Sequence, residues 1–280
     1  ISSKETEYTN YSGRGISIDG SVIVSDKAHL IGRANRGVEN TGFFLMGSMS
    51  IENDAMVSAF AMYGSAGGNI KGFDALNANI EVNGKLIVES GNAGDKRYGS
   101  GIFLRNSNLK VLGTGSVEAR AGNPGPTSGF GVYGVKTSNG GSITIDGGGF
   151  LASGGSGAIY PYDTPVTITE PPVYYEISEN KDGSNPTIYT SAEDWATVNG
   201  KFENIKYIKA TTIYDVYVND VQVTRLNSHD VLGDGTVSYE VANVTNPATL
   251  RLNNASFAGD LKLSEPTSII LTGENAVGDI

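Results

Sequence analysis

The sequence predicts an all-β protein, namely a parallel (right-handed) β-helix solenoid with coils of about 30 residues, plus a small β module. Two observations predict the solenoid. Similar glycine-led segments recur at nearly constant spacing, and within each segment short runs alternate apolar and polar residues between Gly and Asn. No stretch carries a convincing helical period, so α/β and all-α architectures are disfavoured.

The repeat is the first element to justify. Four segments begin at glycines that lie 30, 29 and 30 residues apart, namely Gly42, Gly72, Gly101 and Gly131. Shorter versions begin near Gly15 and Gly157. A period in this range indicates stacked repeats, in which each coil buries its apolar face against the next.

Each repeat is expected to hold three short strands separated by turns. In the segment led by Gly72 they are Gly72–Leu76, Ala78–Val82 and Lys85–Glu89. A propeller or a sandwich is the alternative all-β fold, but propeller blades need about 40 residues and hairpins. Strong Asn-Gly hairpin turns are scarce in residues 15–165, so the β-helix is preferred.

One string in the fourth repeat imitates a nucleotide-binding motif. Residues 129–134 read GFGVYG, which fits the G-x-G-x-x-G pattern of dinucleotide-binding turns. That motif requires a following helix, whereas the next residues, including Ile143 and Ile145, alternate as in a strand. The glycines are therefore assigned to turns of the solenoid.

The pattern changes near Glu170. Pro171 and Pro172 interrupt the repeat, and residues 214–224 read as a hairpin around Asn219-Asp220. This module is expected to cover an open end of the solenoid, where unpaired strand edges need protection. Alternating leucines then return in the tail, which either joins the first solenoid or starts another. The predicted organisation is an N-terminal extension (1–14), a parallel β-helix (15–170), a small β module (171–247) and a further β-helix-like coil (248–280).

Composition limits the partners. The formal net charge is −10 and no basic patch stands out in the sequence, so nucleic acid is not expected as a partner. The absence of cysteine excludes disulfides, thiolate metal sites and cysteine nucleophiles. No apolar run approaches the length of a membrane span, and none is expected in this chain.

Two groups of segments carry a resemblance. YDVYVNDVQVTRLNSHDVLGDGTVSYE followed by ATLRLNNASF is similar to a segment of large cell-surface proteins of Gram-positive bacteria that leads into β-helical repeats. NANIEVNGKLIVESGN and NSNLKVLGTGSVEARAGN resemble repeats of secreted β-helix proteins that include a carbohydrate-binding family. The resemblance implies a secreted or cell-surface location and polysaccharide or cell-wall glycan as partner. It supplies no catalytic motif for particular positions.

The candidate binding site comes from stacking the repeats on their glycines. The position after each glycine is uniformly apolar and is expected to point inward, so the next position should point outward. An outward column of aromatic rings suits stacking on sugar rings. The alternative is that a loop or the second module covers this face. The predicted ligand-binding column is Phe44, Asp74, Phe103, Tyr133 and Tyr160.

Other candidates are weaker. Asp74, Arg105, Lys136 and Asp163 are charged residues expected near this face, but no set of carboxylates recurs on neighbouring coils as a lyase or hydrolase would need. His29 and His229 lie far apart and are expected in turns or on the surface. No cofactor is expected. Two segments, Asp182–Asn185 and Asp234–Thr236, offer oxygens to Ca²⁺ but fit turns better.

Three functions follow in order of preference. The first is a secreted or cell-surface bacterial module that binds polysaccharide without catalysis. The second is a structural spacer or adhesin stalk, in which the aromatic column is covered. The third is a polysaccharide lyase or hydrolase, which requires Asp74, Arg105 or Asp163 to converge with further acids. The exposure of Tyr133 and Tyr160 distinguishes the first from the second.

Overall fold

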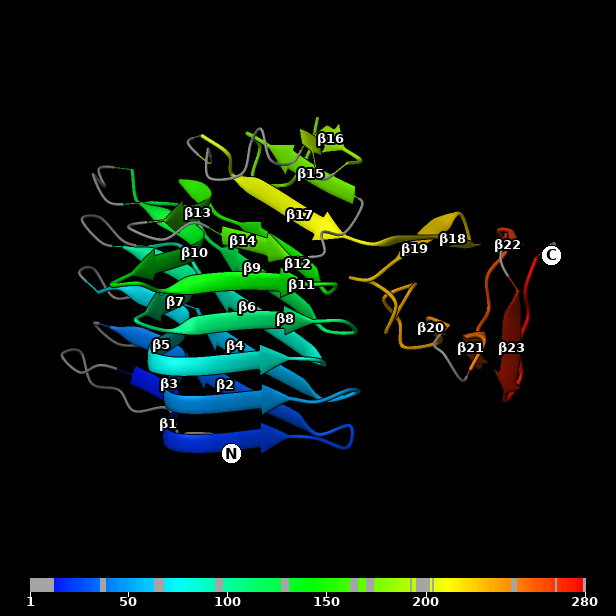
Figure 1. The fold of residues 1–280 in the computed structure, drawn as a ribbon, viewed down its shortest axis with the longest axis horizontal. Helices are drawn as coiled ribbons and strands as arrows, with labels where there is room; N and C mark the ends of the chain where they lie inside the picture. The colour runs from blue at the N-terminus through cyan, green and yellow to red at the C-terminus, as the bar shows by residue number, and fades with distance from the viewer. Residues whose placement is uncertain are drawn as a thin grey trace. The chain divides into compact units, whose positions relative to one another are not determined.

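The computed structural model describes residues 13–35, 39–62, 68–93, 98–126, 131–161, 166–169, 174–191, 193–194, 202, 204–242, 246–264 and 266–278. The chain forms two compact units, Ile1–Ala210 and Thr211–Ile280. All of the elements labelled in Figure 1 are strands, and the first unit is a parallel β-solenoid, as predicted.

The solenoid has two walls. The first wall starts as one long strand per coil and splits into two strands per coil after the third. Its long strands are β1 (Gly13–Val24), β3 (Asn40–Ile51) and β5 (Ile70–Val82). Its split coils are β7 (Gly99–Arg105) with β8 (Asn108–Leu112), β10 (Val132–Ser138) with β11 (Ser142–Asp146), and β13 (Gly157–Pro161) with β14 (Val166–Thr169).

The second wall contributes one strand per coil. These strands pair in parallel and in chain order, and they are β2 (His29–Ala34), β4 (Met56–Ala61), β6 (Lys85–Ser90), β9 (Ser116–Ala121) and β12 (Gly149–Ser153). The three strands predicted for one repeat are therefore present in the split coils. In the repeat led by Gly72, the first two form the single strand β5, in which Asn77 takes a positive φ of 50°.

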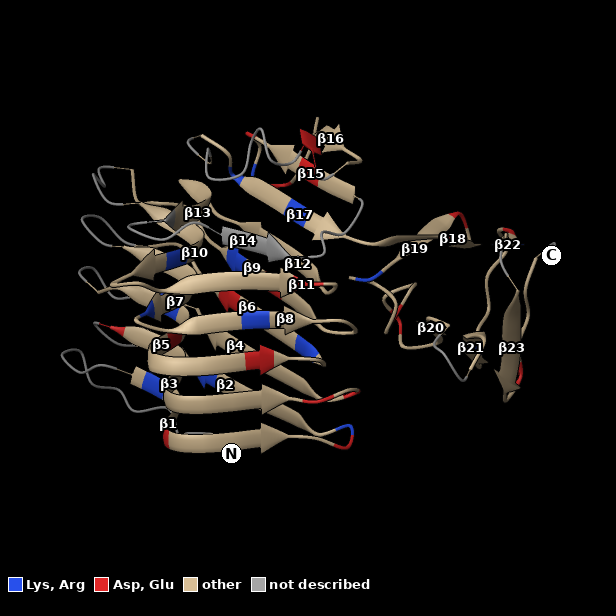
Figure 2. Ribbon diagram, in the orientation of Figure 1, with Lys and Arg blue, Asp and Glu red and all other residues tan. Residues whose placement is uncertain are grey.

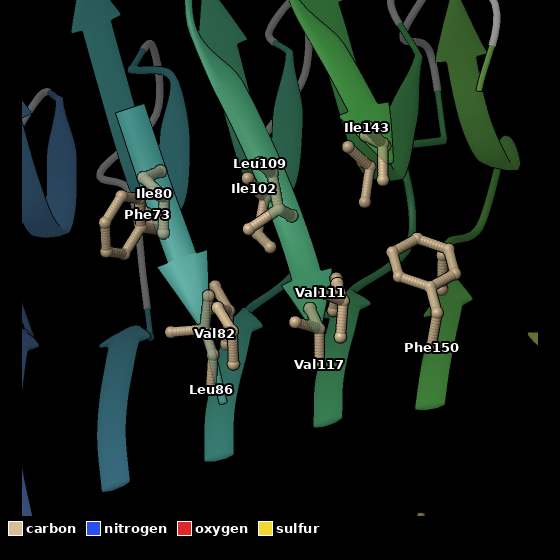
Figure 3. Close-up of a cluster of buried hydrophobic side chains, with 14 of the residues drawn as sticks. Phe73, Ile80, Val82, Leu86, Ile102, Leu109, Val111, Val117, Ile143 and Phe150 are labelled. Carbon is tan, nitrogen blue, oxygen red and sulfur yellow. The ribbon is translucent and has the colours of Figure 1, made fainter. Parts of the chain in front are cut away.

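Apolar side chains fill the space between the walls. Figure 3 shows the inward residues of successive coils stacked on one another, including Phe73, Ile102, Val111 and Phe150. The rings of Phe43 and Phe73 are stacked, with centroids 5.0 Å apart and planes 4° from parallel. Residues at equivalent positions on neighbouring coils thus form a continuous apolar core, as the alternating pattern predicts.

A ladder of glycines joins the two walls along one edge. A Cβ on Gly42 would lie 2.6 Å from the nitrogen and oxygen of Phe60 on the opposite wall and 2.7 Å from the oxygen of Gly72 in the next coil. Each ladder glycine meets the carbonyl oxygen of its successor in the same way, in the order Gly15, Gly42, Gly72, Gly101, Gly134. The recurring glycines are therefore required by close backbone approach at this edge.

The predicted start of the fourth coil is wrong by three residues. Val135, not Val132, pairs with Ile102, so Gly134 rather than Gly131 belongs to the ladder. The turn after β8 and the loop before β10 are longer than in the preceding coil, which moves the strand along the sequence. The GFGVYG segment is accordingly followed by the rest of strand β10 and then by strand β11, where a dinucleotide-binding motif would be followed by a helix.

Antiparallel strands end the second wall. These are β15 (Tyr174–Ser178), β16 (Thr187–Tyr189) and β17 (Tyr207–Thr211). β17 pairs antiparallel with β12, and Tyr175 and Ile208 belong to the solenoid core. Strand β17 therefore pairs with the last strand of the second wall, and the compact unit that contains the solenoid extends to Ala210.

The second unit has its own small core around Val216, Val237 and Leu250. The predicted hairpin is present, with Asn219 at a φ of 51° and Asp220 at a φ of 61°, as a type I′ turn requires. β21 and β23 pair in parallel within this unit, and the sheets that contain β21, β22 and β23 are separate from the sheets of the solenoid. The strands are β18 (Ile213–Val218), β19 (Val221–Thr224), β20 (Val237–Glu240), β21 (Ala248–Asn253), β22 (Leu261–Leu263) and β23 (Thr267–Thr272).

Candidate functional site

The outer side of the first wall carries the predicted column, and we call it the ring face. Residues that occupy equivalent positions on successive strands are Ser17, Phe44, Asp74, Phe103, Lys136 and Tyr160. The shared register predicted for Phe44, Asp74, Phe103 and Tyr160 is therefore confirmed. Tyr133 is the exception, because Lys136 holds its place.

Tyr133 nevertheless reaches the same face from the neighbouring column. It pairs with Ser100 and Gly157, and its ring lies 4.7 Å from the Tyr160 ring at a tilt of 34°. A Cβ on Gly157 would lie 3.1 Å from the Tyr133 ring, so the glycine leaves the space that this ring occupies. Burial raises the pKa of the Tyr133 hydroxyl, and Tyr160 and Tyr98 add to the rise.

The end of the ring face nearest the N-terminus is closed. Phe44 is only 7% exposed although it lies outside the solenoid core, and the Arg14 guanidinium stands 3.9 Å above its ring. Asp74 is 3% exposed. Its carboxylate accepts two bonds from Arg105, at 3.1 and 3.0 Å, and one from Lys71 at 2.7 Å. Phe44 and Asp74 are therefore covered by their basic neighbours.

Phe103 marks the centre of the ring face. Its half-buried ring is approached by three cationic groups, with Lys136 at 5.2 Å, Lys71 at 5.4 Å and Arg105 at 5.5 Å from the centroid. Each distance is within the range of a cation–π contact. The ring is thus the point at which the basic side chains of three successive coils meet.

Lys136 also contacts two rings at the open end. Its Nζ lies 4.2 Å from the Tyr98 centroid and 5.7 Å from the Tyr160 centroid. Burial lowers the pKa of the Lys136 ammonium, and the nearby charge of Lys71 lowers it further. In Figure 2 the blue segments of β10 and β7 mark basic residues on these two paired strands.

The accessible aromatic surface lies beside this lysine. Tyr98 is 42% exposed and Tyr160 is 36% exposed, while Phe103 and Tyr133 are half-buried. These four rings offer flat apolar surface with phenolic hydroxyls at its margin, which is the combination that stacks on sugars. Of the five predicted site residues, Phe103, Tyr133 and Tyr160 are accessible.

The predicted charged candidates are only partly brought together. Asp74, Arg105 and Lys136 meet around Phe103, whereas Asp163 lies outside the described residues. Both oxygens of Asp74 are engaged by bases. A glycosidase needs two carboxylates separated by several Å. In this structure the Asp74 carboxylate is instead held in ion pairs with Lys71 and Arg105.

The histidines and the two candidate calcium turns lie elsewhere. His29 is exposed and its Nε2 lies 2.8 Å from the Ser58 hydroxyl, whereas His229 lies in the second unit. Asp182 accepts bonds from the nitrogen and hydroxyl of Ser184, and Asp234 does the same with Thr236, so both segments are local turns as predicted. The described residues contain no group of three or more acidic or histidine side chains placed to hold a metal ion.

Two polar hollows of about 700 Å³ lie away from the ring face. One follows the turns near Asp26, Asp54 and Asn83. The other is lined by residues of the second wall and of the connection between β15 and β16, including Arg120 and Asp182. Neither has an aromatic ring among its lining residues in the described part of the chain, so neither resembles the predicted site.

Arg14, Lys71 and Tyr98 were not predicted from the sequence. The prediction followed a single column down the coils, whereas the face is two columns wide. Arg14 and Lys71 each directly precede a ladder glycine, in the strings RGI and KGF, and this offset is the signal that would have placed them on one column. Tyr98 precedes β7 and carries no periodic signal.

Within the described ranges, no helix combines the length and apolar character needed to cross a membrane. Comparisons with protein-family models, with curated proteins and with solved structures gave no match to this chain. The ring face is therefore the basis for assigning a function.

Proposed function

We propose that this chain is a non-catalytic, secreted or cell-surface module of bacterial origin that binds polysaccharide through the ring face of its solenoid. The observation that carries the proposal is the pair of tilted rings Tyr133 and Tyr160, with Tyr160 and Tyr98 exposed to solvent. Exposed aromatic surface held on a rigid sheet is costly to leave in water, and it commonly marks an interaction site.

The geometry suits an extended polymer better than a small molecule. The rings come from strands β10 and β13 and from the residue before β7, so they follow the stacking direction of the coils. Neighbouring strands lie about 4.8 Å apart, which gives a flat strip rather than a closed pocket. A sugar chain laid along this strip would contact one ring after another.

The test is affinity electrophoresis of the full chain in gels containing neutral and acidic polysaccharides. We expect Tyr160→Ala to weaken retardation about five- to tenfold, because it removes one stacking surface worth about 1 kcal/mol. Tyr217→Ala is the matched control, since Tyr217 is a partly exposed tyrosine on the hairpin of the second unit. Tyr133→Ala should behave like Tyr160→Ala.

The competing function is a structural spacer. It would be supported if no polysaccharide in the panel retarded the wild-type chain. It would also be supported if Tyr160→Ala, Tyr133→Ala and Tyr217→Ala were all retarded as strongly as the wild-type chain. Release of reducing or unsaturated sugar ends during incubation would instead favour a lyase or hydrolase.

A further inference from the structure

The charge of the ring face is opposite to that of the chain as a whole. Lys71, Arg105 and Lys136 converge on the Phe103 ring, and Asp74 is the acidic partner that the structure places among them. Three positive charges and one negative charge leave a local excess of positive charge. The whole sequence carries a formal net charge of −10. This excess is therefore a local feature of the site.

Two of the three cations, Lys71 and Arg105, form ion pairs with Asp74. Its carboxylate is bonded to Lys71 and forms a bidentate pair with Arg105, which is a strong and geometrically specific arrangement. The ion pairs formed among the described residues do not include Lys136. Its ammonium instead faces the rings of Tyr98, Phe103 and Tyr160.

A half-buried ammonium beside a second lysine is electrostatically unfavourable, and an anion placed there would relieve the cost. The structure surrounds this ammonium with the same rings that form the proposed sugar-binding strip. We infer that the polysaccharide bound by the ring face is acidic, with an anionic substituent of the sugar paired to Lys136. This inference rests on the proposed function and narrows its ligand to one chemical class.

Two features favour an acidic polysaccharide over a nucleic acid. Nucleic-acid binding relies on many phosphate contacts, whereas of the three cations around Phe103 only Lys136 lies outside the ion pairs formed among the described residues. A polysaccharide with one charge per sugar needs few cations, and it also offers the apolar ring faces that Tyr133 and Tyr160 would stack on. Lys71 and Lys136 lie on strands two coils apart. Two strand spacings amount to about 10 Å, so one sugar chain crossing the coils would meet both lysines.

The experiment compares matched polymers with the full chain. Polygalacturonate is set against its fully methyl-esterified, uncharged form, and dextran sulfate is set against dextran. The first pair tests carboxylate and the second tests sulfate as the source of the charge. Lys136→Gln removes the proposed anion contact. Lys110→Gln is the control, because Lys110 is a first-wall lysine on β8 that is 43% exposed and lies 3.6 Å from Asp146.

We expect retardation by an acidic polymer and not by its neutral counterpart, a loss of about tenfold in Lys136→Gln, and no change in Lys110→Gln. Added salt should weaken binding, since the ion pair is partly exposed.

Three outcomes would overturn the inference, each differently. Equal retardation by neutral polymers, lost in Tyr160→Ala but not in Lys136→Gln, would reject the acidic ligand and keep the proposed function. Binding of poly-dT as tight as that of any acidic glycan, with the same Lys136→Gln loss, would reject polysaccharide as the class. No retardation by any polymer would reject the proposed function and the inference with it.

Discussion

The solenoid and the second unit use the same residue types under different constraints. Each contains a bidentate pair between arginine and a carboxylate, with nearly equal distances. Asp74 and Arg105 pair at 3.1 and 3.0 Å, and Glu240 and Arg251 pair at 3.1 Å on both branches. The Asp74 side chain is 4% exposed, whereas the Glu240 side chain is 59% exposed. Local geometry is the same, and only the surroundings differ.

Glycines show the same contrast. Gly42 sits in the ladder, where neighbouring backbone occupies the space a side chain would need. Gly233 has a φ of 78°, and a Cβ placed on it would meet nothing within 4 Å. Gly42 is therefore constrained by the backbone of the neighbouring coils, whereas Gly233 is constrained by its own backbone angles.

The largest expected effect comes from the ladder. Gly42→Ala should lower the free energy of unfolding of the solenoid by about 3 kcal/mol or more, because the new methyl group meets backbone atoms that cannot rotate away. Gly233→Ala should cost only about 1 kcal/mol, the penalty of a left-handed residue in open space. Urea unfolding followed by circular dichroism measures both. Equal losses would mean that the ladder can open slightly to admit the methyl group.

The second-largest expected effect is a difference in stability loss when each of the two bidentate arginine–carboxylate pairs is broken. Asp74→Asn should destabilise the chain by about 2 kcal/mol, because Lys71 and Arg105 would keep their charges without a carboxylate. Glu240→Gln should cost less than about 0.5 kcal/mol, since the exposed pair is screened by water. Thermal unfolding at low and at high salt separates the cases. A large effect in Glu240→Gln would show that burial is not what distinguishes them.

The smallest effect concerns the hairpin turn and has the opposite sign. Asp220 takes a positive φ of 61° in the turn, and glycine is preferred at the second central position of a type I′ turn. Asp220→Gly should therefore stabilise the second unit by about 0.5 kcal/mol. Asp215→Gly is the control, because Asp215 is an exposed strand residue without a positive φ and its replacement should destabilise the strand. Urea unfolding of both variants decides; a destabilised Asp220→Gly would contradict the turn assignment.

The same contrast explains what the sequence could predict. Glycines at 42, 72 and 101 repeat because the ladder requires them, so the fold and the register of three coils followed from their spacing. The fourth register failed because Gly131 and Gly134 both fit the pattern, and loop length is not encoded in a strand's alternation. Val135 and Thr137 are buried on either side of the partly exposed Lys136, so the inward alternation starts directly after Gly134. Counting from Gly131 would instead place Lys136 inward, and this distinguishes the two glycines.

The site was less predictable than the fold. Alternation along a strand indicated which side chains point outward, and this placed Phe103 and Tyr160 correctly. Whether an outward ring is accessible depends on its neighbours in adjacent columns. Phe44 is covered by Arg14, a residue from another coil whose contact no local pattern reveals. The three cations around Phe103 likewise come from three different coils, so no pattern within one coil reveals that they meet.

The connections between strands vary much more in length on one side of the solenoid than on the other. Turns from the first wall to the second hold two to four residues, whereas the returning loops before β3, β5, β7, β10 and β13 hold five, eight, eight, ten and three. Those returning loops lead directly into the strands that carry the rings. The strands of the first wall are therefore similar from coil to coil, whereas the connections that precede them are not. The ladder contacts of Gly42, Gly72, Gly101 and Gly134 persist although these connections differ in length, so the register of the first wall does not depend on the length of the returning connection.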